Sequence, residues 1–306
     1  MWLSLAFLSA ALLGFYDVSK KAALKDNAVL PVLLLNTLFS TLIFSPFILD
    51  NLFGATWFSG TICDSATYAE GMAGTTLKAH LLVIAKAFIV LSSWIAGYFG
   101  LKHLPITIVG PINATRPVLV LVGAMLIFGE RLNLYQWTGV LLAALSIFMM
   151  SISSKKEQID FKKNKWIFCV AFATVMGAVS GLYDKFIMKQ LSPMFVQSWF
   201  NFYQLIIMSI ICMILWYPSR KQTTPFHWSW AIPLISIFIA AADFAYFNAL
   251  GSPESMISVV SLVRRGSVII SFACGALIFR ERNLKAKALD LGLVLLGMLF
   301  IWLGSR

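Results

Sequence analysis

The sequence has little charge for its length. Charged residues make up 12% of its 306 residues, whereas a soluble domain carries about 25%. Hydrophobic residues account for 59%, and the mean hydropathy is +0.84. This balance excludes an ordinary soluble protein and indicates a polytopic membrane protein.

Cysteine and histidine are also scarce. The sequence has four cysteines and three histidines and no C-x-x-C pair, and three of the cysteines lie in apolar runs. A disulfide framework or a zinc site is therefore not expected. The histidines are far apart in the sequence, so we predict no metal site. These residues are Cys63, Cys169, Cys212, Cys274, His80, His103 and His227.

No phosphate-binding loop of the Walker type occurs, so ATP hydrolysis by this chain and a nucleotide cofactor are not expected. The net charge of +11 does not indicate nucleic-acid binding either. In a membrane protein an excess of Lys and Arg first reports which loops face the cytoplasm. Here that rule predicts a cytoplasmic connector at 153–165 and both termini on the opposite side.

Long apolar runs recur along the whole chain. Each has roughly 20 residues, enough to cross about 30 Å of hydrocarbon, and helices satisfy their own backbone in lipid. The first run has no Lys or Arg ahead of it, which favours a retained helix over a cleaved signal peptide. We predict an all-α integral membrane protein with ten transmembrane helices at 2–22, 29–49, 79–101, 105–128, 132–152, 166–188, 193–217, 227–249, 254–279 and 286–304.

The two halves of the chain are related by identities at fixed offsets. The motif G-F-Y-D at 14–17 recurs as G-L-Y-D at 181–184, and F-G-E-R at 128–131 recurs as F-R-E-R at 279–282. Tyr98, Phe99, Pro105 and Arg116 recur 148 residues later. With five helices each, the halves enter the membrane in opposite directions, a recurrent plan of secondary transporters. We predict one repeat at 1–152, a basic connector at 153–165 and a second repeat at 166–306.

With these motifs the chain resembles the drug/metabolite transporter superfamily, in its EamA-like branch. The resemblance implies export or exchange of small metabolites through a central cavity, lined mainly by the first, third and fourth helices of each half. By position it places Lys20 or Lys21 and Lys189 at the family's lysines near the ends of the first helices. It also makes Glu130 and Glu281 structural, helix-closing residues. It does not name a substrate.

Arg116 lies near the middle of its predicted span, where a charge costs about 2.5–3.5 kcal/mol on insertion scales. It must therefore face protein or a wet cavity. Its planar donor fork suits a carboxylate or phosphate, but a structural ion pair with an acid in the membrane is an equal alternative. Arg264 matches it in the second half, and we favour Arg264 over its neighbour Arg265 for the cavity.

Three carboxylates within spans are candidates for coupling transport to an ion. They are Asp17, Asp184 and Asp243. Asp17 and Asp184 could instead neutralise Lys20, Lys21, Lys185 or the arginines, and Asp17 has the i, i+4 spacing of a helical ion pair to Lys21. Asp243 has no acidic counterpart in the first half, where Ile95 holds its position, so it could serve coupling or answer the extra Arg265.

The remaining candidates are aromatic and amide side chains that could form a hydrogen-bonding cavity wall. Such groups often bond only to neighbouring helices. Lys86 lies a third of the way into its span, from where its side chain could reach the interface. The predicted wall residues are Trp94, Tyr98, Tyr246, Asn36, Asn201, Tyr203 and Asn248.

Taken together, the sequence predicts a secondary transporter of a small metabolite with an anionic group, such as an amino acid or organic anion, working by alternating access. The alternative is a flippase for a lipid-linked sugar or phosphate. A membrane-embedded enzyme is disfavoured, since the longest loop, 50–76, has no His and one Cys. We expect a monomer or homodimer in the bacterial cytoplasmic membrane, with the lipid bilayer and a metabolite as its partners and no nucleic acid.

Overall fold

The structure is a computed structural model of the chain. It describes residues 2–53, 57–58, 61, 77–116, 118–120, 122–123, 133–135, 137–139, 141–142, 145, 149, 163–188, 190–221, 223–250, 260, 263–264, 266–278 and 284–304. All regular elements in these ranges are helical, as the sequence predicts. The α-helices are α1 (Trp2–Leu24), α2 (Val29–Phe53), α3 (Leu77–His103), α4 (Ile106–Ala114), α7 (Lys165–Ile187), α8 (Pro193–Ile211), α9 (Ala231–Leu250), α11 (Ser267–Leu277) and α12 (Leu284–Gly304).

Five of the described helical segments are long and apolar enough to cross a membrane. They are α2, α3, most of α7, α8 with the short π-helix Cys212–Trp216 that extends it, and most of α9. Shorter apolar helices occur at Ile106–Val120, Ser267–Leu277 and Leu291–Gly304. The expected number of ten spans stays a prediction, and much of the run at 132–152 lies outside the described residues.

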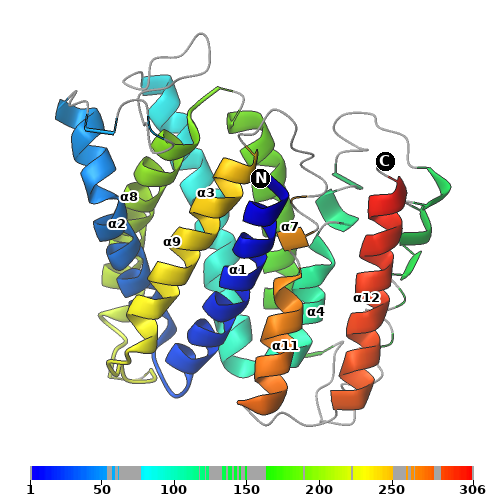
Figure 1. Ribbon diagram of the computed structural model, residues 1–306. Coiled ribbons are helices and arrows are strands. Elements are labelled where there is room, and N and C mark those ends of the chain that lie inside the picture. Colours follow the sequence, from blue (N-terminus) through cyan, green and yellow to red (C-terminus); the bar gives the residue numbers. More distant parts are fainter. Residues whose placement is uncertain are drawn as a thin grey trace.

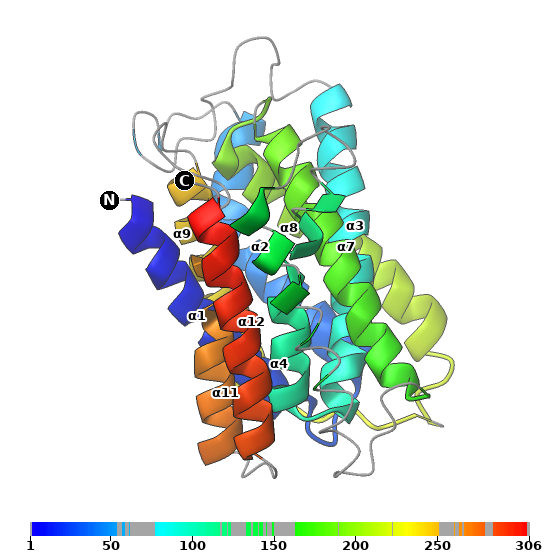
Figure 2. The same ribbon diagram turned by 90° about the vertical axis from the view of Figure 1, so that its right-hand side faces the viewer.

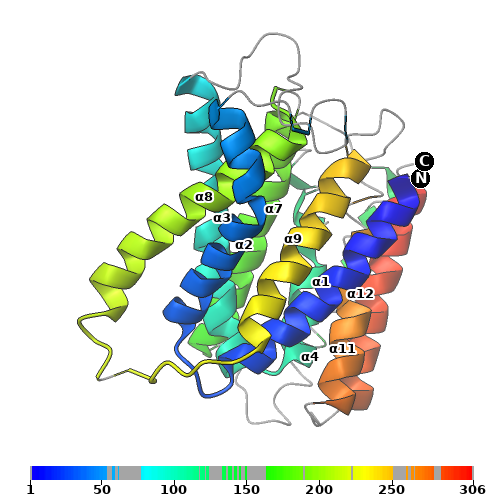
Figure 3. The same ribbon diagram turned by 60° about the vertical axis from the view of Figure 1, so that its left-hand side comes forward.

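Each half supplies helices that pack against the equivalent helices of the other half. In the sequence alignment α1 corresponds to α7, and α3 corresponds to α9. In the structure α1 lies against α9, and α7 lies against α3, which is the same pairing with the halves exchanged. The equivalent helices α2 and α8 also pack together. Figures 1 and 3 show these neighbours, with α1 and α7 running in opposite directions. This arrangement fits two repeats of opposite orientation.

The fourth helices of the halves, α4 and α11, also pack against each other. Beside them α12 lies along α4 and α11 (Figure 2), where Leu291 packs on Val268. Side chains on the outer faces remain exposed although they are large and apolar, for example Phe7 on α1 and Phe168 on α7. A bilayer would cover these side chains and so remove their apolar surface from water.

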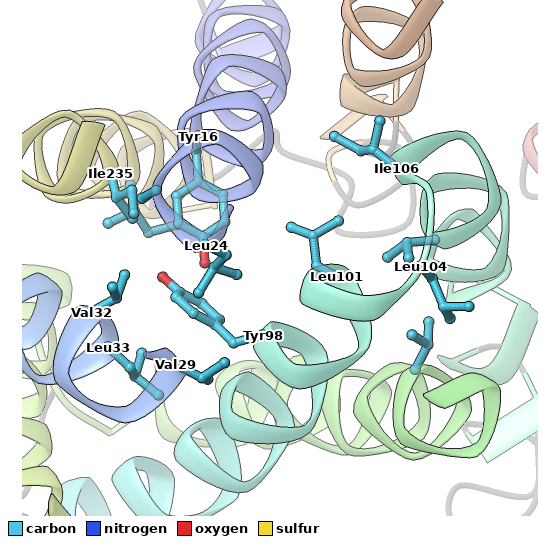
Figure 4. Close-up of a cluster of buried hydrophobic side chains, with 14 of the residues drawn as sticks. Tyr16, Leu24, Val29, Val32, Leu33, Tyr98, Leu101, Leu104, Ile106 and Ile235 are labelled. Atoms are coloured by element: carbon cyan, nitrogen blue, oxygen red, sulfur yellow. The ribbon is translucent and has the colours of Figure 1, made fainter. Parts of the chain in front are cut away.

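The largest apolar core of the described residues joins α1, α2, α3, α4, α7, α8 and α9. Tyr98 is 1% exposed and lies with Leu24, Leu33 and Ile235 in this cluster, as Figure 4 shows. Lys21 ties the end of α1 to the turn between α3 and α4. Its Nζ donates to the carbonyl oxygens of Leu101 and Leu104, at 2.7 and 2.6 Å. These carbonyls at the end of α3 would otherwise lack helical donors.

The second half begins with conventional helix caps. The side chain of Asn164 accepts a hydrogen bond from the backbone N–H of Trp166 at the start of α7. Ser192 does the same for Phe195 at the start of α8, and Pro193 follows it. Asn and Ser are favoured N-caps, and Pro is favoured in the first helical turn. These local signals fix where both helices begin.

Close packing of α1 on α11 depends on Gly14. A Cβ at this position would lie 2.6 Å from the Cβ of Ile270, and a β-carbon cannot move without its backbone. We therefore predict that Gly14→Ala lowers the free energy of unfolding by about 1–3 kcal/mol, the usual cost of overpacking. Thermal unfolding of the detergent-purified protein measures the loss. Gly292→Ala on α12 is the matched control, because no neighbouring atom of the described residues lies within 4 Å of its added Cβ; equal destabilisation of both variants would contradict the packing explanation.

Candidate functional site

A cavity of about 180 Å³ lies between the two halves, lined by residues of α1, α3, α4, α7, α8, α9 and α11 and by residues adjoining these helices. It is smaller than the roughly 300–1,000 Å³ of pockets for drug-sized ligands. Among the described residues, seven charged side chains line it: Asp17, Lys20, Lys86, Arg116, Asp184, Asp243 and Arg264. Four are cationic and three are carboxylates. Such a concentration of charge is costly in a membrane protein and typical of a ligand or ion pathway.

Each carboxylate of the cavity has one cationic partner. Lys20 Nζ lies 2.8 Å from Asp17 Oδ1. Lys86 on α3 pairs with Asp184 on α7. Arg264, just before α11, pairs with Asp243 on α9. All three pairs are mostly shielded from solvent, and Lys86 is only 3% exposed.

Arg116 is the described cavity cation that takes part in none of these three ion pairs. It follows Thr115, the C-cap of α4. No carboxylate of the described residues lies within 4 Å of its guanidinium, and its buried Nε has no hydrogen-bond partner among them. The sequence predicts that Arg116 either binds an anionic ligand or forms a structural ion pair. The described part of the chain shows no such ion pair. The described lining of the cavity carries one more positive than negative charge.

The backbone of α7 provides the seat for this guanidinium. A Cβ at Gly177 would overlap the Cζ, Nη2 and Nε atoms of Arg116. The guanidinium therefore lies against the backbone of α7 at Gly177, in the space that a side chain would otherwise fill. One turn later Gly181 also lines the cavity, but a Cβ there would meet only Val120 Cγ2, at 3.9 Å.

Aromatic rings surround the charges. The Cζ of Arg264 lies 4.0 Å from the ring centroid of Tyr246. The Nζ of Lys20 lies 4.3 Å from that of Tyr16, and the Nζ of Lys86 lies 4.9 Å from that of Phe200. Such contacts stabilise cations away from water. The cavity thus combines charged side chains with aromatic surface.

Eight of the twelve predicted site residues line the cavity. They are Arg116, Arg264, Tyr98, Tyr246, Trp94, Asp17, Asp184 and Asp243. Four others are not among its lining residues. Asn36 accepts from Ser236 Oγ, Asn201 donates to the Gln197 carbonyl, Tyr203 bonds His80, and Asn248 donates to the Phe244 carbonyl. These four bond to neighbouring side chains or backbone, as membrane polar groups commonly do.

Asp17 pairs with Lys20, one of the basic partners expected from the sequence, at i, i+3 spacing, and Lys21 binds carbonyls at the end of α3. Lys86 does not extend to the interface, because its side chain is buried on Asp184. Sequence reasoning also gave no role to Gly177. The signal was there, since Gly177, Gly181 and Asp184 share one face of a helix at four- and three-residue spacing.

Several predicted residues cannot be placed. Arg265, Lys189, Glu130 and Glu281 lie outside the described residues. Within the described ranges no group of three His, Cys, Asp or Glu side chains is arranged to hold a metal ion.

The comparisons with known proteins agree with this architecture. The model of the EamA-like transporter family matches residues 1–152 and 164–303. The chain belongs to the EamA-like transporter family. This EamA-like protein is therefore a multi-pass membrane protein and a transporter of small molecules, within the drug/metabolite transporter superfamily. A search of curated proteins finds no match.

The fold has a solved counterpart. A structure titled only "Crystal structure of protein" aligns with a TM-score of 0.65 over 99% of this chain and 98% of its own. Only 13% of the residues are identical, so the likeness shows the shared fold and nothing about the substrate.

The seat at Gly177 yields a prediction about anion binding. Gly177→Ala should push the Arg116 guanidinium from its place and weaken binding of a carboxylate such as propionate by about ten- to a hundredfold, the worth of a hydrogen bond to a charged group. Anion-dependent thermal stabilisation measures this change. Stability without ligand should change little, because the displaced atoms end a flexible side chain. The matched control is Gly181→Ala, which has room for its methyl group; similar losses in both variants would contradict the role of the seat.

The Lys86–Asp184 pair yields a prediction about stability. Lys86→Met should cost about 3–5 kcal/mol, because it leaves a buried carboxylate without its partner. Combining it with Asp184→Asn should recover much of this loss, since no uncompensated charge then remains. Thermal or denaturant unfolding of the two variants tests the pair. If the double variant is less stable than Lys86→Met, the two side chains do not act as a buried ion pair.

Proposed function

We propose that this EamA-like transporter is a secondary transporter, an exporter or exchanger, of small metabolites that carry an anionic group, such as an amino acid or an organic anion. The observation that carries the proposal is the charge count of the cavity. Its described lining has three carboxylates, each paired, and four cations, of which Arg116 has no carboxylate within 4 Å. A carboxylate or phosphate group of the substrate would complete this fourth pair.

The physical cost of the unpaired cation supports a ligand at this place. A guanidinium shielded from water is costly unless hydrogen bonds and an opposite charge compensate for its lost hydration. Its planar donors match a carboxylate or phosphate in two parallel hydrogen bonds. A substrate that supplies these bonds would be selected strongly over a neutral compound of the same size.

The inverted packing of the halves supports alternating access. The contacts of α1 with α9 and of α7 with α3 are equivalent under exchange of the repeats. Two such repeats can trade conformations, which opens the cavity first to one side of the membrane and then to the other. A substrate then shifts the populations of the two states only as far as it binds them differently.

For coupling to an ion we propose the three cavity carboxylates. Asp17 has the most exposed side chain of the three, at 27%, and Ser271 Oγ lies 3.5 Å from its Oδ2. Asp184 and Asp243 pair with cations from other helices. Protonation of any of them would release its cation inside the cavity. We further propose that the protein works as a monomer or homodimer in the bacterial cytoplasmic membrane.

Arg116→Gln tests the function most simply. Wild-type protein should be stabilised against heat by carboxylates or phosphates from a metabolite panel, since ligands that bind the folded state raise its melting temperature. Compounds that stabilise it should also be taken up by proteoliposomes. Arg116→Gln should lose both responses. Arg220→Gln is the control, because it removes a cation outside the cavity, where Arg220 stacks on Tyr217.

The panel also separates the competing functions. Stabilisation by amines or neutral compounds alone, unchanged in Arg116→Gln, would overturn the anion site. Stabilisation by lipid-linked phosphates, but not by soluble anions, would favour a flippase that holds a head-group phosphate at the same arginine.

A further inference from the structure

We infer that the cavity accepts a ligand with a single anionic group and discriminates against dianions, because only one of its two equivalent arginines is available. This inference rests on the proposed function and specifies its substrate class. It follows from the places where the two repeats differ.

The two arginines occupy equivalent positions in the repeats, 148 residues apart. Arg264 already has a counter-charge within the protein, although its buried Nε, like that of Arg116, has no hydrogen-bond partner among the described residues. It forms an ion pair with Asp243, and its guanidinium lies over the ring of Tyr246 at 4.0 Å. At the same offset the first half has Ile95 where the second has Asp243. The sequence thus provides an internal carboxylate for Arg264 and none at the matching position for Arg116.

A second difference provides the seat of Arg116. The offset of 167 that relates G-F-Y-D to G-L-Y-D places Ala10 of α1 opposite Gly177 of α7. Only the glycine leaves room for a guanidinium against the helix. Both differences between the repeats distinguish the two arginines. Arg116 lies against Gly177 and has no acid at the matching position, whereas Arg264 is paired with Asp243.

The lysines do not offer a second anion site either. Lys20 pairs with Asp17 and Lys86 pairs with Asp184. Among the described lining residues, a second anionic group of the ligand would have to displace one of the three internal carboxylates or stay buried without a counter-charge. Either alternative is unfavourable in a site shielded from water. Asp243 thus acts as a specificity-determining residue, because it fills the position that a second ligand carboxylate would take.

Succinate and its monomethyl ester provide a matched pair of probes. They have nearly the same length, but at neutral pH one is a dianion and the other a monoanion. The wild type should bind the ester more tightly by about tenfold or more, the worth of one unpaired charged group, as measured by titrating the thermal stabilisation. Asp243→Asn should release Arg264 and reverse or abolish this preference. Asp26→Asn is the control, since Asp26 is an exposed acid with a φ of 51° that Asn tolerates.

A double variant keeps the test decisive. Asp243→Asn combined with Arg264→Gln removes the released cation, so the preference for the monoester should return. If the double variant still binds succinate as well as Asp243→Asn does, Arg264 is not the second anion contact and the inference is wrong. Equal binding of both probes by the wild type would also overturn it, while leaving the anion-binding function intact. Binding of neither probe, or of both without loss in Arg116→Gln, would instead count against the proposed function.

Discussion

Inside a bilayer a charged side chain needs an opposite charge or hydrogen bonds, since neither lipid nor a dry core solvates it. The cavity of this protein is organised by that requirement. Three carboxylates from α1, α7 and α9 each face one cation, and two of the three pairs join different helices. Of these, only the Lys86–Asp184 pair joins the two halves, and the three pairs leave Arg116 as the described cavity cation without a carboxylate partner. The proposed anion binding depends on Arg116, the described cavity cation that these ion pairs do not include.

The symmetric fold and the asymmetric site have different origins. Small residues such as Gly14 and Gly100 let helices of the two halves approach closely, and the helix pairs exchange under the repeat relation. A symmetric scaffold suits a protein that opens to either side of the membrane in turn. Single substitutions between the repeats, Asp243 for Ile95 and Gly177 for Ala10, then give each arginine a different surrounding. In the proposed mechanism, motion depends on the symmetric helix packing and specificity depends on these substituted positions.

Much of this could be predicted from the sequence. Apolar run lengths gave the helical class and the ends of α2, α7 and α9 to within a few residues, because hydrocarbon thickness fixes helix length. Charged residues in the middle of predicted spans indicated the cavity, because a charge in the membrane must face protein or a wet cavity. The partners could not be predicted: Lys86 meets Asp184 from 98 residues away, which depends on how helices cross. The seat at Gly177 and the places of Asn36, Asn201, Tyr203 and Asn248 depend on the rotation of each helix in the same way.

The most direct measurement is the location of a bound anion by diffraction. Crystals grown with 3-bromopropionate would show the bromine by its anomalous signal and the carboxylate in the density. The proposed anion site predicts one bound molecule per chain. Its carboxylate should lie on the guanidinium of Arg116, and Asp243 should still be paired with Arg264. A carboxylate bound elsewhere, or an Arg116 paired with a carboxylate of the protein in the presence of the ligand, would contradict it.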